Sequence, residues 1–318
     1  MNGIESQLCP AEERPQALAI LYQQLPPAER ESQVEKLLSP DGVRLEGLII
    51  CKSETDLLGV VFCMSSPGRV MMMWTPRIAL GIKEKEKRKV LASLVDAAKN
   101  YGRDRQARFV QLLGDEPQPP FDGVLDEAGF FLLTQLIYAR RPVMSGEFVE
   151  RLPEGIELVS YTDELHEELL ELLATSYEGS LDCPELNGIR SMDDIFESHR
   201  GENPFDPERW KLVRSNGQWI GCILLSAVEK DRLIEISYVA LVPSARGKGL
   251  GRILTREAIR YAEKHHYNSV VLAVDSRNSP ALGMYEDEGF TPWDVRQVYL
   301  SLLDPLSWGG EPSDLDDG

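Results

Sequence analysis

A glycine-rich turn between a strand and a helix constrains the fold of this chain most strongly. Residues 233–242 (LIEISYVALV) are rich in β-branched and aromatic residues and stop at Pro243, which predicts a strand. The turn at 246–251 (RGKGLG) follows, and the apolar residues after it recur at i, i+3 and i+4, as in an amphipathic helix. The apolar run at 269–274 (SVVLAV) then predicts a second strand. This region is therefore expected to form a strand, a crossover helix and a parallel strand.

Such a turn suits a phosphate or pyrophosphate. Glycines at alternate positions let the backbone approach a ligand closely, and the helix N-terminus behind them adds a partial positive charge. Arg246 and Lys248 add fixed charge. Two commoner phosphate motifs do not fit. A P-loop would need a Lys and a hydroxyl residue directly after Gly249, and the dinucleotide fingerprint would need a glycine where Arg252 stands.

A second motif lies downstream, where residues 278–290 read N-x-x-A-x-x-x-Y-x-x-x-G-F. Together with R-x-x-G-x-G after a strand ending in Val-Pro, this pattern resembles the GCN5-related N-acetyltransferase (GNAT) superfamily, whose members transfer an acetyl group from acetyl-CoA to an amine. The resemblance covers about residues 235–290 and rests on two separate motifs in the right order. It implies that the turn holds the pyrophosphate of acetyl-CoA.

The resemblance also implies particular roles for single residues. Backbone groups at the end of the strand are expected to hold the pantetheine arm and to polarise the thioester carbonyl. The expected cofactor-binding residues are Leu241, Val242, Arg246, Gly247, Lys248, Gly249, Leu250, Gly251 and Asn278. No metal is expected to take part.

Two residues are expected to be catalytic. In related histone acetyltransferases and in mycothiol synthases, a glutamate at the position of Glu235 serves as general base, and the family's tyrosine near the departing sulfur matches Tyr285. The alternatives are a solvent-facing Glu235 and a Tyr285 that only packs in the core. On period-two alternation, Glu235, Ser237, Val239 and Leu241 are expected to share one face of the strand. Because no cysteine has an identified base, direct transfer without an acyl-enzyme is expected.

The resemblance predicts an N-acetyltransferase whose acceptor is an amine of a small molecule or a peptide. The alternative is a non-catalytic, acyl-CoA-binding regulatory protein. Acylation of a hydroxyl and use of a longer acyl-CoA remain open, because the motif specifies CoA and not the acyl group. The segment 177–207 matches the region that lies over the acceptor pocket in this family, and by resemblance it would set substrate choice.

Composition limits the partners and the compartment. With 34 basic and 52 acidic residues the net charge is −18, which argues against unassisted binding to nucleic acid or to an anionic membrane. The five cysteines form no C-x-x-C pair, so neither a disulfide framework nor a zinc site is expected. The N-terminus lacks the pattern of a signal peptide and no apolar run has the length of a membrane span, so a cytoplasmic protein is expected.

An internal repeat predicts two copies of one fold. Tyr101 and Tyr261, Val110 and Val270, Asp115 and Asp275, and the Gly-Phe pairs at 129–130 and 289–290 are each separated by 160 residues. The expected fold class is α/β (α+β), with two tandem GNAT-like domains, each a mixed and mostly antiparallel sheet flanked by helices. The expected boundaries are 1–145, 146–310 and an acidic tail at 311–318. This arrangement resembles that of tandem acetyltransferases such as the mycothiol synthases.

The first copy lacks the chemistry of the second. The positions 160 residues before the turn residues carry bulky or acidic side chains, and the position 160 residues before Tyr285 is Leu125. Glu86 in particular would repel a phosphate. The residues of the first copy at the positions equivalent to Gly247, Gly249 and Gly251 are Lys87, Lys89 and Leu91. We therefore expect the first domain to bind no acetyl-CoA and only the second to be catalytic.

Overall fold

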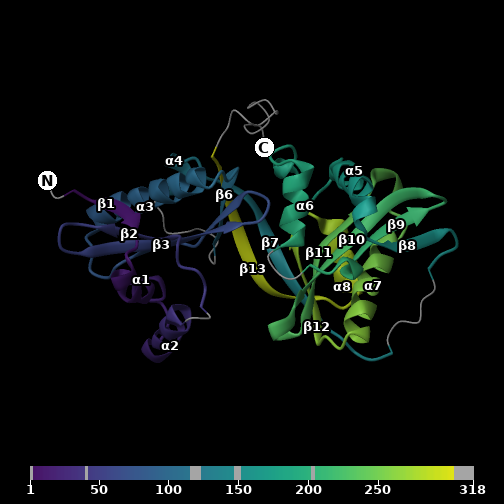
Figure 1. Ribbon diagram of the computed structural model, residues 1–318, viewed down its shortest axis with the longest axis horizontal. Coiled ribbons are helices and arrows are strands. Elements are labelled where there is room, and N and C mark those ends of the chain that lie inside the picture. The colour runs from purple at the N-terminus through teal and green to yellow at the C-terminus, as the bar shows by residue number, and fades with distance from the viewer. Residues whose placement is uncertain (1–2, 40–41, 115–122, 147–151, 202–204, 304–318) are drawn as a thin grey trace. The chain divides into compact units, whose positions relative to one another are not determined.

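The computed structural model describes residues 3–39, 42–114, 123–146, 152–201 and 205–303. The chain divides into two compact units (Figure 1). The first comprises Met1–Leu133 together with the segment that begins at Gln297, and the second comprises Thr134–Arg296. The expected tail at 311–318 and the repeat residue Asp115 lie outside the described residues.

The first unit contains a mostly antiparallel sheet with helices on both faces. Its strand order is β1-β2-β3-β4-β6-β13, with β5 paired to β3, and only β4 and β6 run parallel. Its strands are β1 (Glu5–Leu8), β2 (Leu48–Lys52), β3 (Leu57–Ser66), β4 (Val70–Met73), β5 (Arg77–Ile78), β6 (Phe109–Gly114) and the second half of β13 (Thr291–Leu302). Its helices are α1 (Arg14–Leu21), α2 (Pro27–Leu38), α3 (Glu84–Asp104) and α4 (Val124–Glu127).

The second unit has the same plan. Its strand order is β7-β12-β11-β10-β9-β8, and only β11 and β12 run parallel. Its strands are β7 (Phe131–Pro142), β8 (Ile156–Ser160), β9 (Trp210–Ser215), β10 (Gln218–Val228), β11 (Leu233–Leu241) and β12 (Ser269–Asp275). Its helices are α5 (His166–Tyr177), α6 (Met192–Arg200), α7 (Leu250–Lys264) and α8 (Ser279–Asp287). Short 3₁₀ turns lie at Ala11–Glu13, Asp163–Leu165, Pro184–Leu186, Pro207–Arg209, Glu229–Asp231 and Pro243–Ala245.

Two apolar cores cover the faces of the second sheet. One is formed by α7 with inward residues of β10, β11 and β12. The other is formed by α5 and α6 with the opposite residues of β9, β10 and β11. The helix α7 runs along the sheet in Figure 1, where β11 leads toward its N-terminus. We call these the α7 face and the α5/α6 face.

The two copies agree in detail where the sequence predicted a repeat. Phe130 donates its N–H to the oxygen of Leu125 at 2.9 Å, and Phe290 donates to Tyr285 at 3.0 Å. The glycine before each phenylalanine has a positive φ, 75° at Gly129 and 83° at Gly289. Each short helix therefore ends in the same left-handed turn, which glycine adopts without strain.

The last strand that follows each copy in the sequence pairs with a strand of the other copy. The strand β7 follows α4 in sequence but pairs with β12, with Pro142 opposite Ser269 and Leu136 opposite Asp275. The strand β13 follows α8 but pairs with β6 in the first unit, with Leu302 opposite Phe109. We call this the strand exchange. A division at residue 145 leaves all of β7 in the first domain, whereas the structure groups its residues from Thr134 onward with the second unit.

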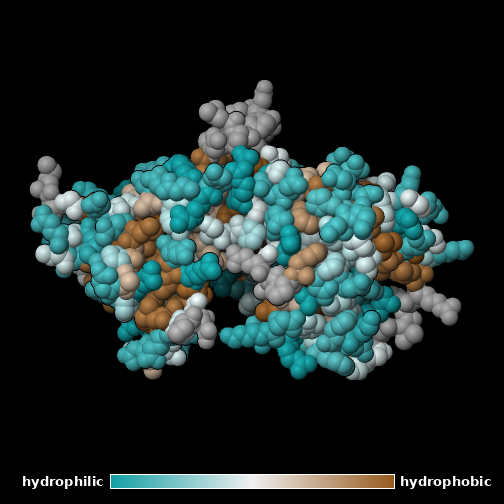
Figure 2. All heavy atoms as spheres, viewed as in Figure 1, coloured by the Kyte–Doolittle hydropathy of each residue, from teal (hydrophilic) through white to brown (hydrophobic). Residues whose placement is uncertain are grey.

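The surface agrees with the charged composition. The face drawn in Figure 2 is mostly hydrophilic, with apolar atoms showing in separate patches. Among the residues that the structure describes, no helix combines the length and the apolar character needed to span a membrane.

Candidate functional site

The glycine turn forms a set of outward-facing N–H groups at the start of α7. Gly247 and Gly249 have φ values of 72° and 78°, in the left-handed region that disfavours other residues. A Cβ at either position would meet nothing within 4 Å, so the backbone conformation and not crowding requires glycine. Within the described residues, no hydrogen bond uses the N–H groups of Gly247, Lys248 or Gly249. The first N–H groups of α7 also have no partner inside the helix.

Gly251 has a different role from the other two glycines. A Cβ at Gly251 would lie 3.0 Å from the sulfur of Met284 on α8. A side chain at Gly251 would force the side chain of Met284 to move. Gly251 therefore permits close packing of the helix that carries Tyr285.

Arg246 braces the turn with its side chain. Its guanidinium donates to the carbonyl oxygens of Ser176 at 2.7 Å, Glu178 at 2.8 Å and Gly179 at 3.0 Å. A fourth bond, from Nε, reaches the oxygen of Leu241 at 3.1 Å. The side chain that the sequence suggested as a phosphate ligand thus joins the turn to the C-terminal end of α5. Lys248 is exposed and is the cation of this turn that can turn toward a phosphate.

A bulge in β11 interrupts the alternation of its side chains between the two faces of the sheet. The register with β10 shifts between Leu224, opposite Tyr238, and Leu225, opposite Ile236, so Ser237 is an extra residue. Ile236 and Val239 both pack on the α7 face, whereas Tyr238 packs on the α5/α6 face. The expectation that Glu235, Ser237, Val239 and Leu241 share one face is therefore wrong, because the bulge reverses the alternation after Ser237.

The same strand offers unpaired backbone beyond Ile236. In the part of the chain that the structure describes, the ladder with β12 covers only Leu233–Ile236, so no strand pairs with the second half of β11 on that side. The oxygen of Leu241 accepts a hydrogen bond from Nε of Arg246 at 3.1 Å. Val242 donates its N–H to Ile220 at 3.0 Å on the β10 side. By alternation, Val239 and Leu241 present their backbone groups to the unpaired side. Val239 could not be selected from the sequence, because only the register shows which residues face outward.

Glu235 lies on the α5/α6 face, in the paired half of β11. It stands opposite Ser226, whose hydroxyl lies 2.7 Å from that of Ser237. No described residue makes a hydrogen bond to its carboxylate, and burial raises the pKa of Glu235 above its ordinary value. A half-buried carboxylate with a raised pKa and no partner has the properties of a general base.

The motif residues on α8 are placed by the fold. Asn278 caps this helix, because its side-chain oxygen accepts the N–H of Ala281 at 3.3 Å. Tyr285 packs its ring against Phe290, with the ring centroids 5.6 Å apart. Burial, with a smaller contribution from Asp182, raises the pKa of Tyr285 well above its usual value. The phenol therefore stays protonated at neutral pH and can donate a proton.

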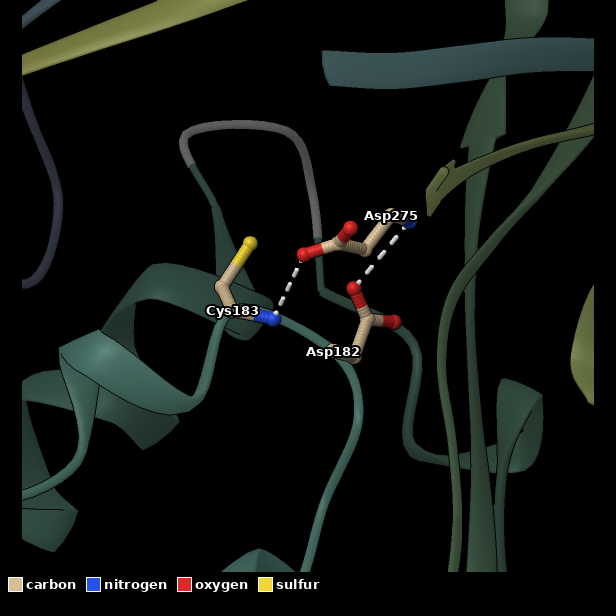
Figure 3. Close-up of side chains that lie close together, drawn as sticks. All are labelled: Asp182, Cys183 and Asp275. Atoms are coloured by element: carbon tan, nitrogen blue, oxygen red, sulfur yellow. Dashed lines mark hydrogen bonds between the residues drawn. The ribbon is translucent and has the colours of Figure 1, made fainter. Parts of the chain in front are cut away.

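A hydrogen-bonded lock holds the loop after α5 to the end of β12 (Figure 3). Cys183 donates its N–H to Asp275 at 3.0 Å, and Asp275 donates its N–H to Asp182 at 3.3 Å. Arg277 joins Asp275 at 2.7 Å and Glu185 at 2.5 Å. The three labelled side chains offer potential metal ligands within 4.8 Å of one another. The oxygens of Asp275 already accept several hydrogen bonds, so the cluster is explained as a structural lock.

The exchanged strand contributes side chains beside Glu235 that the sequence did not indicate. Tyr138 on β7 has its pKa raised by burial and then by the charge of Glu235. Its ring lies 5.9 Å from that of Trp293, which is 61% exposed. No sequence motif includes these residues, because β7 follows the first copy in the chain.

In the first unit, a longer helix replaces the glycine turn. The helix α3 has 21 residues and α7 has 15, although both end at equivalent positions. The additional residues begin at Glu84, so Glu86 and Lys87 lie within the first turns of α3. Backbone N–H groups after the first turn are used inside the helix. Acidic side chains in the first turn also oppose an anion.

Comparison with known proteins agrees with this geometry. Residues 167–290 match the model of the acetyltransferase (GNAT) family. This segment is a GNAT domain. The matched residues include the turn, Glu235 and Tyr285.

A curated relative and two solved structures add to this. A mycothiol acetyltransferase from Thermomonospora curvata is 31% identical over 167 residues, which are 52% of this chain and 54% of that protein. The chain thus spans about half the length of the curated relatives it matches. A GCN5-related N-acetyltransferase from Sphaerobacter thermophilus superposes with a TM-score of 0.61 at 14% identity, covering 95% of this chain and 96% of that one. A tandem GNAT protein from the clavulanic acid biosynthesis pathway gives a TM-score of 0.51 at 15% identity, with 96% and 99% covered. The fold is a tandem GNAT fold.

Proposed function

We propose that the chain is an N-acetyltransferase that moves the acetyl group of acetyl-CoA directly to an amine of a small molecule or a peptide. The observation that carries the proposal is the placement of Glu235 on the same strand that leads into the glycine turn. The unpartnered N–H groups of the turn suit the pyrophosphate. The backbone groups of Val239 and the N–H of Leu241, which face away from β10, suit the amide groups of the pantetheine arm.

Glu235 and Tyr285 then divide the proton transfers. Glu235 takes a proton as the amine nitrogen attacks the thioester carbonyl and the new C–N bond forms. The C–S bond breaks, and Tyr285 donates its proton to the departing sulfur. One proton is taken up and one is released, so the enzyme needs only to exchange protons with solvent before the next turnover.

The cysteines favour direct transfer over an acyl-enzyme. Burial raises the pKa of Cys222 to about 12, and it also raises the pKa of Cys183. Only the thiolate is an effective nucleophile, so neither residue is activated. A stable acetyl-cysteine detected by mass spectrometry during turnover would contradict this step.

The proposal is tested by following CoA release from acetyl-CoA over a panel of primary amines, with product masses measured. We expect amine-dependent release and an acetylated amine. Tyr285→Phe keeps the ring and its contact with Phe290 but removes the proton donor, so a fall in kcat of about 10²-fold or more is expected. Acetyl-CoA binding without release over any acceptor would instead support the non-catalytic regulatory protein. Replacing the amines by alcohols, or acetyl-CoA by longer acyl-CoA, tests the remaining alternatives.

A further inference from the structure

His199 in the last turn of α6 packs on the strand that carries Glu235. Its ring lies over that of Tyr238, with the centroids 4.8 Å apart and the planes at 34°. Tyr238 is fixed in turn, because its hydroxyl lies 3.1 Å from that of Ser176 on α5. Burial, followed by the charge of Arg190, lowers the pKa of His199 to about 4. The imidazole is therefore neutral at physiological pH and can both donate and accept a hydrogen bond.

The imidazole of His199 has no hydrogen-bond partner within the described parts of the chain. Half-buried polar groups normally have one, and leaving such a group unpaired costs free energy. His166 shows the usual situation in the same unit, because its Nδ1 lies 3.2 Å from the hydroxyl of Tyr161. Packing explains the position of His199 but not the choice of a polar ring there, and a ligand atom can supply the missing partner.

The position of His199 relative to Glu235 follows from the bulge. Ser226, which stands opposite Glu235, is bonded to Ser237 on the α5/α6 face. Tyr238 packs on this face as well, because the extra residue at the bulge makes the consecutive side chains of Ser237 and Tyr238 point to the same face. Glu235 and Tyr238 therefore lie on one face, separated by about 7–10 Å along the strand at roughly 3.3 Å per residue. His199 stacks on Tyr238, so a small molecule bound on this face can reach both His199 and Glu235.

We propose that His199 binds the acceptor, exchanging a hydrogen bond with an uncharged hydroxyl or amide group of a primary amine whose nitrogen reaches Glu235. The inference rests on the proposed function and makes its substrate class narrower. The acceptor is an amine with a neutral hydrogen-bonding group a few bonds from the nitrogen. His199 holds this group, and Tyr238 holds His199.

Three variants separate hydrogen bonding from packing. His199→Phe keeps the ring stack on Tyr238 and removes both nitrogens, whereas His199→Gln keeps an uncharged donor and acceptor. His265→Phe is the matched control, because His265 also stacks on a tyrosine, Tyr261, with the centroids 4.2 Å apart at the end of α7. Thermal melting of each variant reports whether the fold is retained.

The kinetic test uses pairs of primary amines that differ only in a hydroxyl or amide group. We expect His199→Phe to raise the KM of the hydroxyl or amide member about tenfold, as for one lost hydrogen bond, with little change in kcat. The KM of the plain amine and of acetyl-CoA should not change, and His199→Gln should restore part of the loss. An equal effect on both members of a pair, or no effect, would overturn the proposal.

A binding test works without turnover. The chain has four histidines, so the ring ¹⁵N resonances can be assigned by substitution, and that of His199 should shift when the hydroxyl or amide amine is added to the CoA complex. If the wild-type protein transfers no acetyl group but this resonance still shifts, the proposed function fails while the binding role stands. Turnover without any shift of the His199 resonance would refute the binding role alone.

Discussion

The guanidinium of Arg246 lies 2.7 Å from the carbonyl oxygen of Ser176, 70 residues earlier in the chain. This contact fixes the glycine turn to the end of α5, the helix that also supports Tyr238. The first residue of the phosphate motif thus positions the turn. We therefore expect the backbone N–H groups and Lys248 to be the phosphate ligands.

We predict that Arg246→Ala destabilises the protein by about 2–4 kcal/mol, because each of its hydrogen bonds contributes roughly 1 kcal/mol net. Denaturant unfolding measures this change. Acetyl-CoA affinity, measured by calorimetry, should fall in parallel because the turn loses its support. Arg246→Lys should not restore stability, since an ammonium cannot reproduce the fork of donors.

Lys248→Ala is the matched control for charge. Lys248 is exposed, so its removal should leave stability within about 0.5 kcal/mol. Acetyl-CoA should nevertheless bind more weakly, and the salt dependence of binding should decrease. Full binding by Arg246→Lys at wild-type stability would show that Arg246 acts only through its charge.

Glu235→Gln should inactivate the enzyme while stabilising the fold at neutral pH. A carboxylate whose folded pKa is raised binds its proton more tightly in the folded state. Its contribution to stability is therefore full below the ordinary pKa of glutamate and is lost as the pH rises through the raised value. Activity has the opposite dependence, since the base must be deprotonated. We expect kcat to fall by about 10²-fold or more with unchanged acetyl-CoA affinity.

The pH profiles of activity and stability check the direction of the pKa shift of Glu235. In the wild type, kcat/KM for the amine should increase with pH, and the increase should occur at a pH above the ordinary pKa of glutamate. The residual activity of Glu235→Gln should not show this increase. The stability difference between the two proteins should grow over the same pH interval. A glutamine variant that is less stable at pH 7 than at pH 4, relative to the wild type, would contradict a buried and unpartnered carboxylate.

The sequence predicted the local parts of the site better than its arrangement. The glycine spacing predicted the turn because positive φ values at Gly247 and Gly249 are a local requirement. The alternation argument failed at Ser237, since a bulge depends on the pairing with β10. The sequence contained no indication of the proposed role of His199, because that role depends on its contact with Tyr238, which lies on a different element.

The first unit should bind no acetyl-CoA, so calorimetry on the full chain should give one site. Gly249→Ala is expected to weaken that site strongly, because the left-handed conformation costs a side chain about 1–2 kcal/mol and the turn would shift. Gly81→Ala is the matched control. Gly81 has a φ of 87° before α3 and open space around it, so it carries the same strain in the other copy. Two sites, or weaker binding by Gly81→Ala, would show that the first unit takes part.

The strand exchange predicts which fragments fold. A fragment of residues 1–145 keeps β7 but lacks β12, and it exposes the edge of β6 that pairs with β13 from Gly114 to Phe109. Unpaired edges associate readily, so this fragment should aggregate or melt without cooperativity. Joining residues 297–303 to residues 1–133 through a flexible linker should restore a monomeric, cooperative unit, as measured by circular dichroism and size-exclusion chromatography. If the fragment 1–145 were the more stable of the two, β7 would belong to the first copy in solution, and Tyr138 could not lie beside Glu235.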